Sequence, residues 1–195
     1  MVVLLCLSCI NENMVIGIQP IGDVSRLYCD SVKSALEEVY GGEVLMLSEI
    51  KIPEHTFVNI KSPRYRADKL IKHLKENQPG NVTYTIGLIS KDISTTKHTE
   101  DGEIKKPTSK YEDWGIFGLG YRPGPSCIVS TFRLKNKNQE VFYSRLKKIA
   151  VHEIGHNLGL PHCPDKTCVM QDAAESISTI DNVSMVLCDK CRRKI

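Results

Sequence analysis

Hydrophobic residues in the first part of the chain follow two spacings, one typical of strands and one typical of helices. Residues 15–19 form a short apolar run, which predicts a buried strand ended by Pro20. A helical period then runs from a cap at Ser25 to about residue 40, where a pair of glycines stops it. Residues 43–52 alternate loosely and predict a second strand. This order predicts a βαβ unit at the start of a mixed sheet.

The middle of the chain continues these patterns. A helix is predicted at about 67–77, with Leu70, Ile71 and Leu74 on its buried side. Further strands are predicted at 82–90, 114–119 and 126–132, and a partly helical segment at 173–187. The polar segment 93–113 shows no periodicity and predicts a long mobile loop. Such a loop suits either the rim of a cleft or a disordered surface insertion.

The length and charge of the chain narrow the class of protein. A chain of 195 residues, 41% of them hydrophobic, is long enough for one buried core and short for two. We therefore predict one α/β (α+β) domain over residues 14–195, preceded by an extension at 1–13 that lacks the basic residues of a signal peptide. A net charge of +3 is too small to indicate a nucleic-acid partner. No apolar stretch reaches the roughly eighteen residues of a membrane span.

A helical period also leads into a cluster of histidines. Apolar residues occur at 142, 146, 149 and 150. His152 and His156 then lie one turn apart on one face, where both imidazoles can bind one zinc ion at about 2.0 to 2.1 Å. Glu153 lies about 100° further round the helix, so it misses the metal but can reach a water there. The pattern predicts two zinc ligands and a general base.

A third histidine, His162, would be carried away from the metal by a straight helix. Gly159 can adopt a positive φ and Pro161 cannot extend a helix, so we expect a turn that brings His162 back as a ligand. Three protein ligands leave the fourth position for water, which is typical of catalytic zinc, and such a water ionises near pH ~7. Ordinary helix histidines are the alternative, but a chance match to the five specified positions is on the order of 1 in 10⁵.

Two pairs of cysteines after His162 predict a second metal site. Their C-x₄-C and C-x₂-C spacings suit a closed, structural zinc held by Cys163, Cys168, Cys188 and Cys191. Two disulfides are the alternative. The sequence favours zinc, because nothing upstream indicates export and the two-residue spacing suits chelation in a reducing compartment. Cys6 and Cys9 form another C-x₂-C, for which a redox or metal pair is the alternative, but their aliphatic neighbours favour buried hydrophobic residues. Cys29 and Cys127 are single and are expected to be structural.

Together these residues form the string HExxHxxGxxHCxxxxCxM, followed by seventeen residues and CxxC. With this string the sequence resembles the archaemetzincins, a family of zinc metallopeptidases among the metzincins. The resemblance implies that Met170 is the Met-turn residue beneath the catalytic zinc and that the four cysteines hold the second zinc. It also implies a compact metzincin-like fold, in which a twisted mixed sheet and the active-site helix flank a cleft and zinc stabilises the C-terminal segment. Residues 115–120 would be the cleft edge that pairs with substrate.

We therefore predict a zinc-dependent metallopeptidase with two Zn²⁺ ions per chain that acts on peptide or protein substrates. Glu153 would take a proton from the attacking water and pass it to the leaving amine. One alternative is a catalytically weak or inactive zinc-binding module that binds peptides or proteins, and another is a redox protein that uses the cysteine pairs. We expect a cytoplasmic (intracellular) monomer with no nucleic-acid or membrane partner.

Overall fold

The computed structural model describes residues 14–172 and 176–195. The predicted extension at 1–13, which includes Cys6 and Cys9, lies outside the described residues. The first three residues of the segment predicted to be partly helical, 173–175, also lie outside them. The rest of that segment contains one short helix, α5 (Ile177–Asn182).

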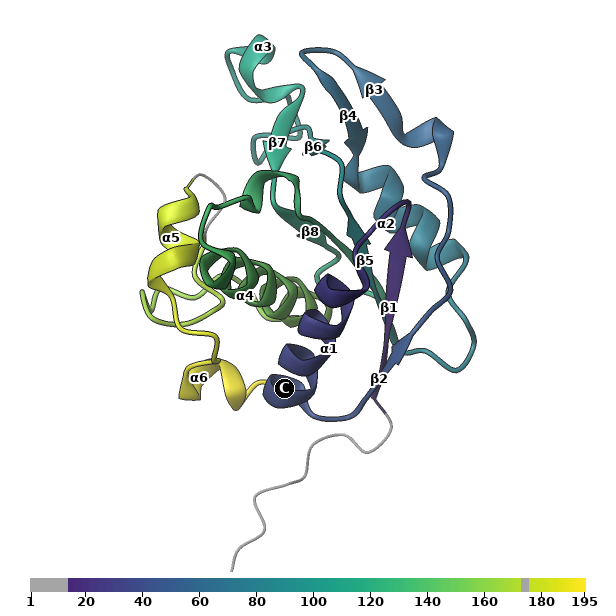
Figure 1. Cartoon of the computed structure of the whole chain (residues 1–195). Coiled ribbons are helices and arrows are strands. Elements are labelled where there is room, and N and C mark those ends of the chain that lie inside the picture. The colour runs from purple at the N-terminus through teal and green to yellow at the C-terminus, as the bar shows by residue number, and fades with distance from the viewer. Residues whose placement is uncertain (1–13, 173–175) are drawn as a thin grey trace, which may run out of the picture.

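The main sheet contains five strands among the described residues and has the order β2-β1-β5-β9-β8 (Figure 1). These strands are β1 (Val15–Ile21), β2 (Glu43–Met46), β5 (Tyr84–Ile89), β8 (Gly118–Gly120) and β9 (Ser126–Ser130). All neighbours are parallel except β8, which runs antiparallel to β9 at one edge. The predicted mixed sheet is therefore confirmed, as is the βαβ unit, because β1 and β2 are parallel neighbours joined by α1 (Arg26–Tyr40).

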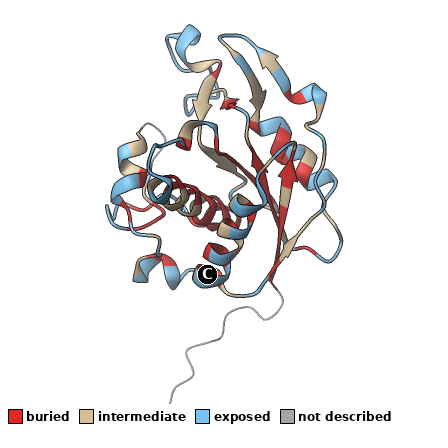
Figure 2. Ribbon diagram, viewed as in Figure 1, coloured by how far each residue is buried: buried red, intermediate tan, exposed pale blue. Residues whose placement is uncertain are grey.

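Helices cover both faces of the main sheet. Helices α1 and α4 (Gln139–Asn157) pack on one face, and α2 (Ala67–Glu76) packs on the other (Figure 1). Ile18 faces the first layer and Ile21 the second, and both are fully buried. Buried residues accordingly concentrate in the sheet and along α4 (Figure 2). A parallel sheet covered on both faces needs strands that are apolar on both sides, which explains the continuous apolar run in β1.

A second sheet of four short strands lies beside the first in the described part of the chain. Its order is β3 (Phe57–Asn59), β4 (Pro63–Arg66), β6 (Ile93–Thr95) and β7 (Trp114–Ile116). The prediction of a mobile loop at 93–113 is therefore wrong, because this segment begins with β6 and contains α3 (Thr108–Tyr111). Strands of three or four residues are too short to show alternation, and pairing with distant segments specifies them instead.

Ion pairs between partly buried arginines and buried aspartates fix the second sheet. The carboxylate of Asp92 accepts hydrogen bonds from Arg64 (2.8 Å) and from Arg133 (2.6 and 2.8 Å). Arg64 also donates to Asp113 (2.9 Å), directly before β7. The guanidinium of Arg133 lies against Gly115, where a Cβ atom would collide with it. This network holds β7 in place, and the chain passes from β7 straight into β8.

Several boundaries differ from those predicted. The predicted strand at 114–119 is divided between β7 in the second sheet and β8 in the main sheet. Strand β1 continues through Pro20 to Ile21. Proline, which has no N–H to donate, is tolerated there because Pro20 faces the side of β2 and lies beyond the end of β2 at Met46. Beyond β2 the N–H of Leu47 still donates to the carbonyl of Ile18 (2.9 Å), and Ile50 forms an isolated bridge with Ile21. The end of α1 is as predicted, since the two glycines that follow it have positive φ.

The remaining elements of the described residues are two 3₁₀ turns, at Glu54–Thr56 and Phe132–Leu134, and a last helix, α6 (Asp189–Arg192). Within residues 14–172 and 176–195, no helix combines the length and the apolar character needed to cross a membrane.

Candidate active site

Helix α4 carries three of the candidate residues and is fixed at both ends. At its start, the side chain of Asn138 accepts a hydrogen bond from a backbone N–H of the first turn (2.8 Å). Towards its other end, the hydroxyl of Tyr40 donates to the carbonyl oxygen of Val151 (2.7 Å) and so ties α4 to α1. His152 and His156 lie one turn apart on this anchored helix, with ring centroids 4.6 Å apart.

Gly159 ends α4 and turns the chain back, as predicted. Its φ is 92°, and its N–H donates to the carbonyl of His156 (2.8 Å). The N–H of Leu160 donates to the carbonyl of Gly155 (2.9 Å), which completes a Schellman motif. The turn places the ring centroid of His162 4.9 Å from that of His156.

The three histidines offer ligand nitrogens that all lie within 4.8 Å of one another. The Nδ1 atoms of His152 and His156 each contact a carbonyl oxygen at 2.8 Å, that of Val169 and that of Leu160 respectively. Because a carbonyl only accepts, Nδ1 carries the proton and Nε2 is left as a ligand. Burial lowers the pKa of His152 to about 3 and that of His156 to about 4, so both rings are neutral at pH ~7, as metal binding requires. The donor set therefore fits zinc.

Glu153 is buried next to these histidines, with 6% of its surface exposed. Its carboxylate lies in a slot left by two glycines of β8. A Cβ atom at Gly118 would lie 2.6 Å from Oε1, and one at Gly120 would lie 3.3 Å from Oε2. Burial raises the pKa of Glu153 to about 8, and a cation held by the histidines would lower it, because a nearby positive charge favours the carboxylate.

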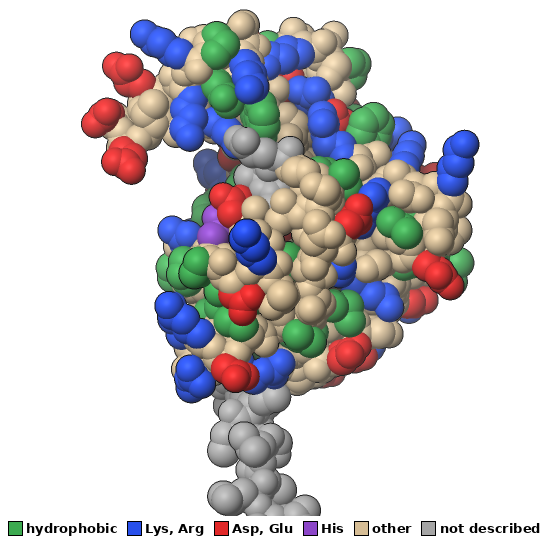
Figure 3. Space-filling model, turned by 90° about the vertical axis from the view of Figure 1, so that its left-hand side faces the viewer, with side chains coloured by type: hydrophobic (Ala, Val, Ile, Leu, Met, Phe, Trp, Pro, Cys, Tyr) green, Lys and Arg blue, Asp and Glu red, His purple; other side chains and the backbone are tan. Residues whose placement is uncertain are grey.

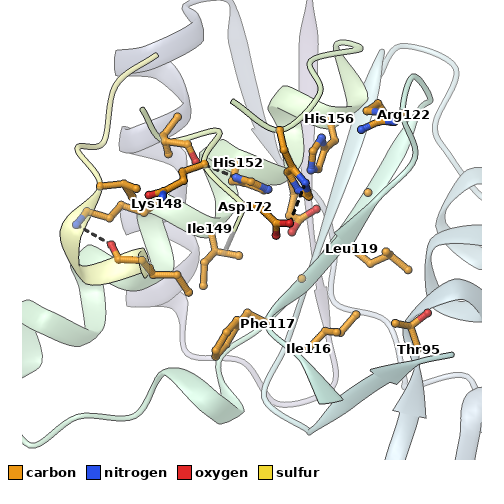
Figure 4. A pocket seen from close by; sticks show the side chains of 18 of the residues that line it. Thr95, Ile116, Phe117, Leu119, Arg122, Lys148, Ile149, His152, His156 and Asp172 are labelled. Atoms are coloured by element: carbon orange, nitrogen blue, oxygen red, sulfur yellow. Dashed lines mark hydrogen bonds and ion pairs between the residues drawn. The ribbon is translucent and has the colours of Figure 1, made fainter. Parts of the chain in front are cut away.

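One pocket of about 430 Å³ is lined by the three histidines and Glu153 (Figure 4). Its walls come from β8 and the residues just before it, from α4, and from the segment that includes α5. Apolar side chains such as Phe117, Ile149 and Ile180 form much of the lining. In the space-filling view a histidine side chain is visible at the hollow between the two halves of the molecule (Figure 3). The site is thus open to a ligand along a cleft.

The four predicted cysteines form a second cluster, in which all Sγ atoms lie within 4.8 Å of one another. The Sγ atoms of Cys163 and Cys188 are 3.7 Å apart. A tetrahedral zinc with Zn–S bonds of about 2.3 Å places its sulfurs about 3.8 Å apart, whereas a disulfide bond is about 2.05 Å long. None of the four is in a disulfide, and the donor set fits a closed zinc site. Cys29 and Cys127 are buried in the core, which agrees with a structural role.

One loop joins the two clusters. Its Val169 carbonyl orients His152, and its Met170 carbonyl accepts a hydrogen bond from the backbone N–H of Cys163 (2.8 Å). The Met170 side chain is fully buried against α4 at Gly155, where a Cβ atom would collide with its sulfur. The two residues that follow Cys168 therefore contact α4 and one of its histidines directly.

Some residues of the site were not predicted from the sequence. Gly118 and Gly120 lie in the predicted cleft edge at 115–120, but their contact with Glu153 was not predicted, although glycine within a strand indicates close approach of another group. No local sequence signal indicates the role of Tyr40, because its hydrogen bond to α4 depends on tertiary packing alone. Asp172 had no such signal either, and its Oδ2 lies 3.5 Å from Nδ1 of the exposed His162.

Comparisons with known proteins show what the chain is similar to. The profile described as Peptidase family M54 matches residues 14–195. The archaemetzincin of Halobacterium salinarum is 30% identical over 191 residues, which cover 93% of this chain and 99% of the relative. The crystal structure of the Archaeoglobus fulgidus archaemetzincin matches with a TM-score of 0.74 at 27% identity, covering 93% of this chain and 100% of the other. That of the Methanopyrus kandleri archaemetzincin gives 0.75 at 25% identity, with 94% and 97% covered.

These matches confirm the resemblance and the predicted α/β metzincin-like fold. They span nearly the whole of this chain and of each relative. The chain therefore belongs to peptidase family M54, a family of zinc metallopeptidases that act on peptides or proteins.

Proposed function

We propose that this chain hydrolyses peptide bonds at one zinc ion held by His152, His156 and His162, with Glu153 as the general base. The observation that carries the proposal is convergence: three ligand nitrogens within 4.8 Å of one another and a buried carboxylate line the same pocket. A zinc ion there would act as a Lewis acid on the scissile carbonyl and lower the pKa of water.

The environment of Glu153 suits proton transfer in both directions. Its carboxylate is shielded from bulk water and lies in the slot beside Gly118 and Gly120. In this position Glu153 takes the proton from the attacking water and then delivers it to the leaving amine. An inactive zinc-binding module is the alternative, but such a module needs no buried carboxylate at this position.

The edge strand β8 supports a way of holding the substrate. The order of the main sheet places β8 at its edge, with β9 on one side, and residues 116–120 line the pocket. Peptides commonly bind by adding a strand to such an edge, with main-chain hydrogen bonds that require no particular side chain. We therefore assign to β8 the pairing with the main chain of the substrate.

The cysteine cluster supports a second, structural zinc, which gives two Zn²⁺ ions per chain. Thiolates that bind zinc must stay reduced, which favours a reducing compartment such as the cytoplasm. Action as a monomer is part of the same proposal, because the histidines, Glu153 and β8 all come from one chain.

Cleavage of a diverse peptide library tests the proposed function. Zinc-loaded protein is expected to cut peptides, with products read by mass spectrometry, and chelation followed by zinc addition should abolish and then restore cutting. The Glu153→Ala variant, prepared in the same way, is the control for contaminating peptidases. Equal cutting by the variant would remove Glu153 from the mechanism. No cutting by either protein, with zinc bound, would favour the inactive module.

Gly118→Ala is expected to lower kcat about tenfold to a hundredfold with little change in stability. The added methyl would lie 2.6 Å from Oε1 and 2.9 Å from Cγ of Glu153, so the whole glutamate side chain would have to shift to relieve the contact. A displacement of about 1 Å at a catalytic group can cost on the order of 100-fold in rate. Steady-state kinetics and the melting temperature check this prediction.

Gly80→Ala is the matched control, because a Cβ atom there meets nothing within 4 Å. It should leave kcat unchanged. If Gly118→Ala also kept the kcat of the parent, the proposed position of the carboxylate in the slot would be wrong.

A further inference from the structure

The short helix α5 supplies one wall of the active-site cleft. Ile180 and the following Val183 line the pocket and are buried, with 3% and 6% of their surfaces exposed. They share the lining of this pocket with Phe117 and with Ile149, which precedes His152 by one helical turn on α4. This part of the cleft is therefore an apolar subsite next to the histidines, and its width depends on where α5 lies.

Helix α5 is too short to be stable without tertiary contacts. It has six residues, whereas isolated helices below about 12–15 residues are marginal in water. At its start Ser176 accepts a hydrogen bond from the backbone N–H of Ser178 (3.2 Å), which is a local contact only. Its position must come from tertiary contacts, chiefly those with α4. Just beyond its end, the N–H of Ser184 also donates to the carbonyl of Thr167 (2.8 Å).

Two cations of α4 hold the C-terminal end of α5. Arg145 binds Asp181 through two hydrogen bonds, Nε to Oδ1 and Nη2 to Oδ2, both 2.7 Å long. The ammonium of Lys148 donates to the carbonyl oxygens of Ile180 and Asp181 (3.0 Å each). The Lys148 bond is drawn as a dashed line in the close view of the pocket (Figure 4). The residues of α5 that are held by α4 are thus the wall residue Ile180 and its neighbour Asp181.

Arg145 is itself held firmly. It is 8% exposed, and its Nη1 donates to the carbonyl of Leu134 in the turn before α4 (3.3 Å). A bidentate guanidinium–carboxylate pair fixes both distance and orientation, unlike a single contact, and here the guanidinium side is buried while the Asp181 side chain is 36% exposed. The exposed Arg26–Asp30 pair of α1 shows the contrast, because it joins one pair of atoms on a solvated helix face.

We propose that Arg145 and Asp181 are positioning residues that set the width of the apolar subsite, and hence which apolar side chains of a peptide substrate fit it. The proposal rests on the proposed peptidase function. Neither residue touches the zinc ligands or Glu153. Both act through Ile180 and Val183.

Asp181→Asn in the full, zinc-loaded chain tests the proposal. The substrates are peptides identical except for one apolar residue, Ala, Val, Leu, Phe or Trp, at the position next to the cleaved bond. The variant is expected to raise the KM of the best parent substrate about tenfold with kcat changed less than threefold, and to accept the larger residues relatively better. Hydrogen exchange of the α5 amides should be at least tenfold faster. Asp181→Glu should restore part of the parent preference.

Asp30→Asn is the matched control and should change neither the preference nor the exchange of α5. An unchanged order and ratio of KM values in Asp181→Asn would overturn the proposal, as would unchanged exchange of α5.

A separate binding experiment distinguishes failure of this proposal from failure of the proposed peptidase function. In a Glu153→Gln background the same peptides are bound but not cut, and calorimetry measures their dissociation constants with and without Asp181→Asn. A changed preference here supports the positioning role even if the parent cleaves nothing. Identical relative affinities, or no binding of any peptide, would overturn it.

Discussion

Replacing Glu153 with glutamine is expected to lower kcat by two or more orders of magnitude while both metal clusters keep their zinc. General acid–base catalysis contributes on the order of 10²–10⁴ in rate, and the amide can neither take nor deliver the proton. Glutamine has nearly the same shape, so it should fit the slot beside Gly118 and Gly120. Steady-state kinetics, zinc content and the melting temperature together check this expectation.

The design of this experiment separates catalysis from folding. Glu140→Gln changes an exposed glutamate in the first turn of the same helix and should leave kcat, KM and zinc content unaltered. Loss of zinc from the histidines in Glu153→Gln would mean that the glutamate supports metal binding. Activity within tenfold of the parent would show that another group takes the proton.

The clustering of the candidate metal ligands could be predicted because their arrangement is set by local geometry. The spacing of His152 and His156 needs only the period of α4, and the return of His162 needs only the turn at Gly159. The same holds for each cysteine pair, whose members are close in sequence. Local rules of this kind act within a turn or two of helix, so the sequence alone contains them.

The surroundings of these residues depend on contacts between distant segments. Strand β6 exists because Ile93 pairs with Tyr65 on one side and with Ile116 on the other, and no local pattern in 93–113 indicates either pairing. The contact between Gly118 and Glu153 likewise requires β8 to lie antiparallel to β9 above α4. Such contacts set the shape of the cleft. Spacing alone therefore predicted the candidate ligands but not the walls, and only the resemblance pointed to residues 115–120 as one edge.

The second large effect is expected at the cysteine cluster: Cys168→Ser should lower the zinc content of reduced protein from two ions per chain to one. Loss of a structural metal is among the changes that exceed about 4 kcal/mol of stability, or roughly 8–16 °C in melting temperature for a chain of this size. Elemental analysis and thermal denaturation measure the two quantities. Cys29→Ser is the control, because Cys29 and Cys168 are equally buried, at 1% exposed, and only Cys168 lies in the cluster.

The same variant also tests whether the two clusters are coupled. The loop that contains Cys168 offers the Val169 carbonyl to His152 and places Met170 beneath α4, so loosening it should weaken zinc binding at the histidines as well. Zinc competition with a chelator should then remove the ion held by the histidines at lower chelator concentration than in the Cys29→Ser control. Two ions retained in Cys168→Ser, or one ion in the parent with the histidine site filled, would contradict the structural zinc. An unchanged chelator midpoint would show that the loop holds His152 without help from the cysteines.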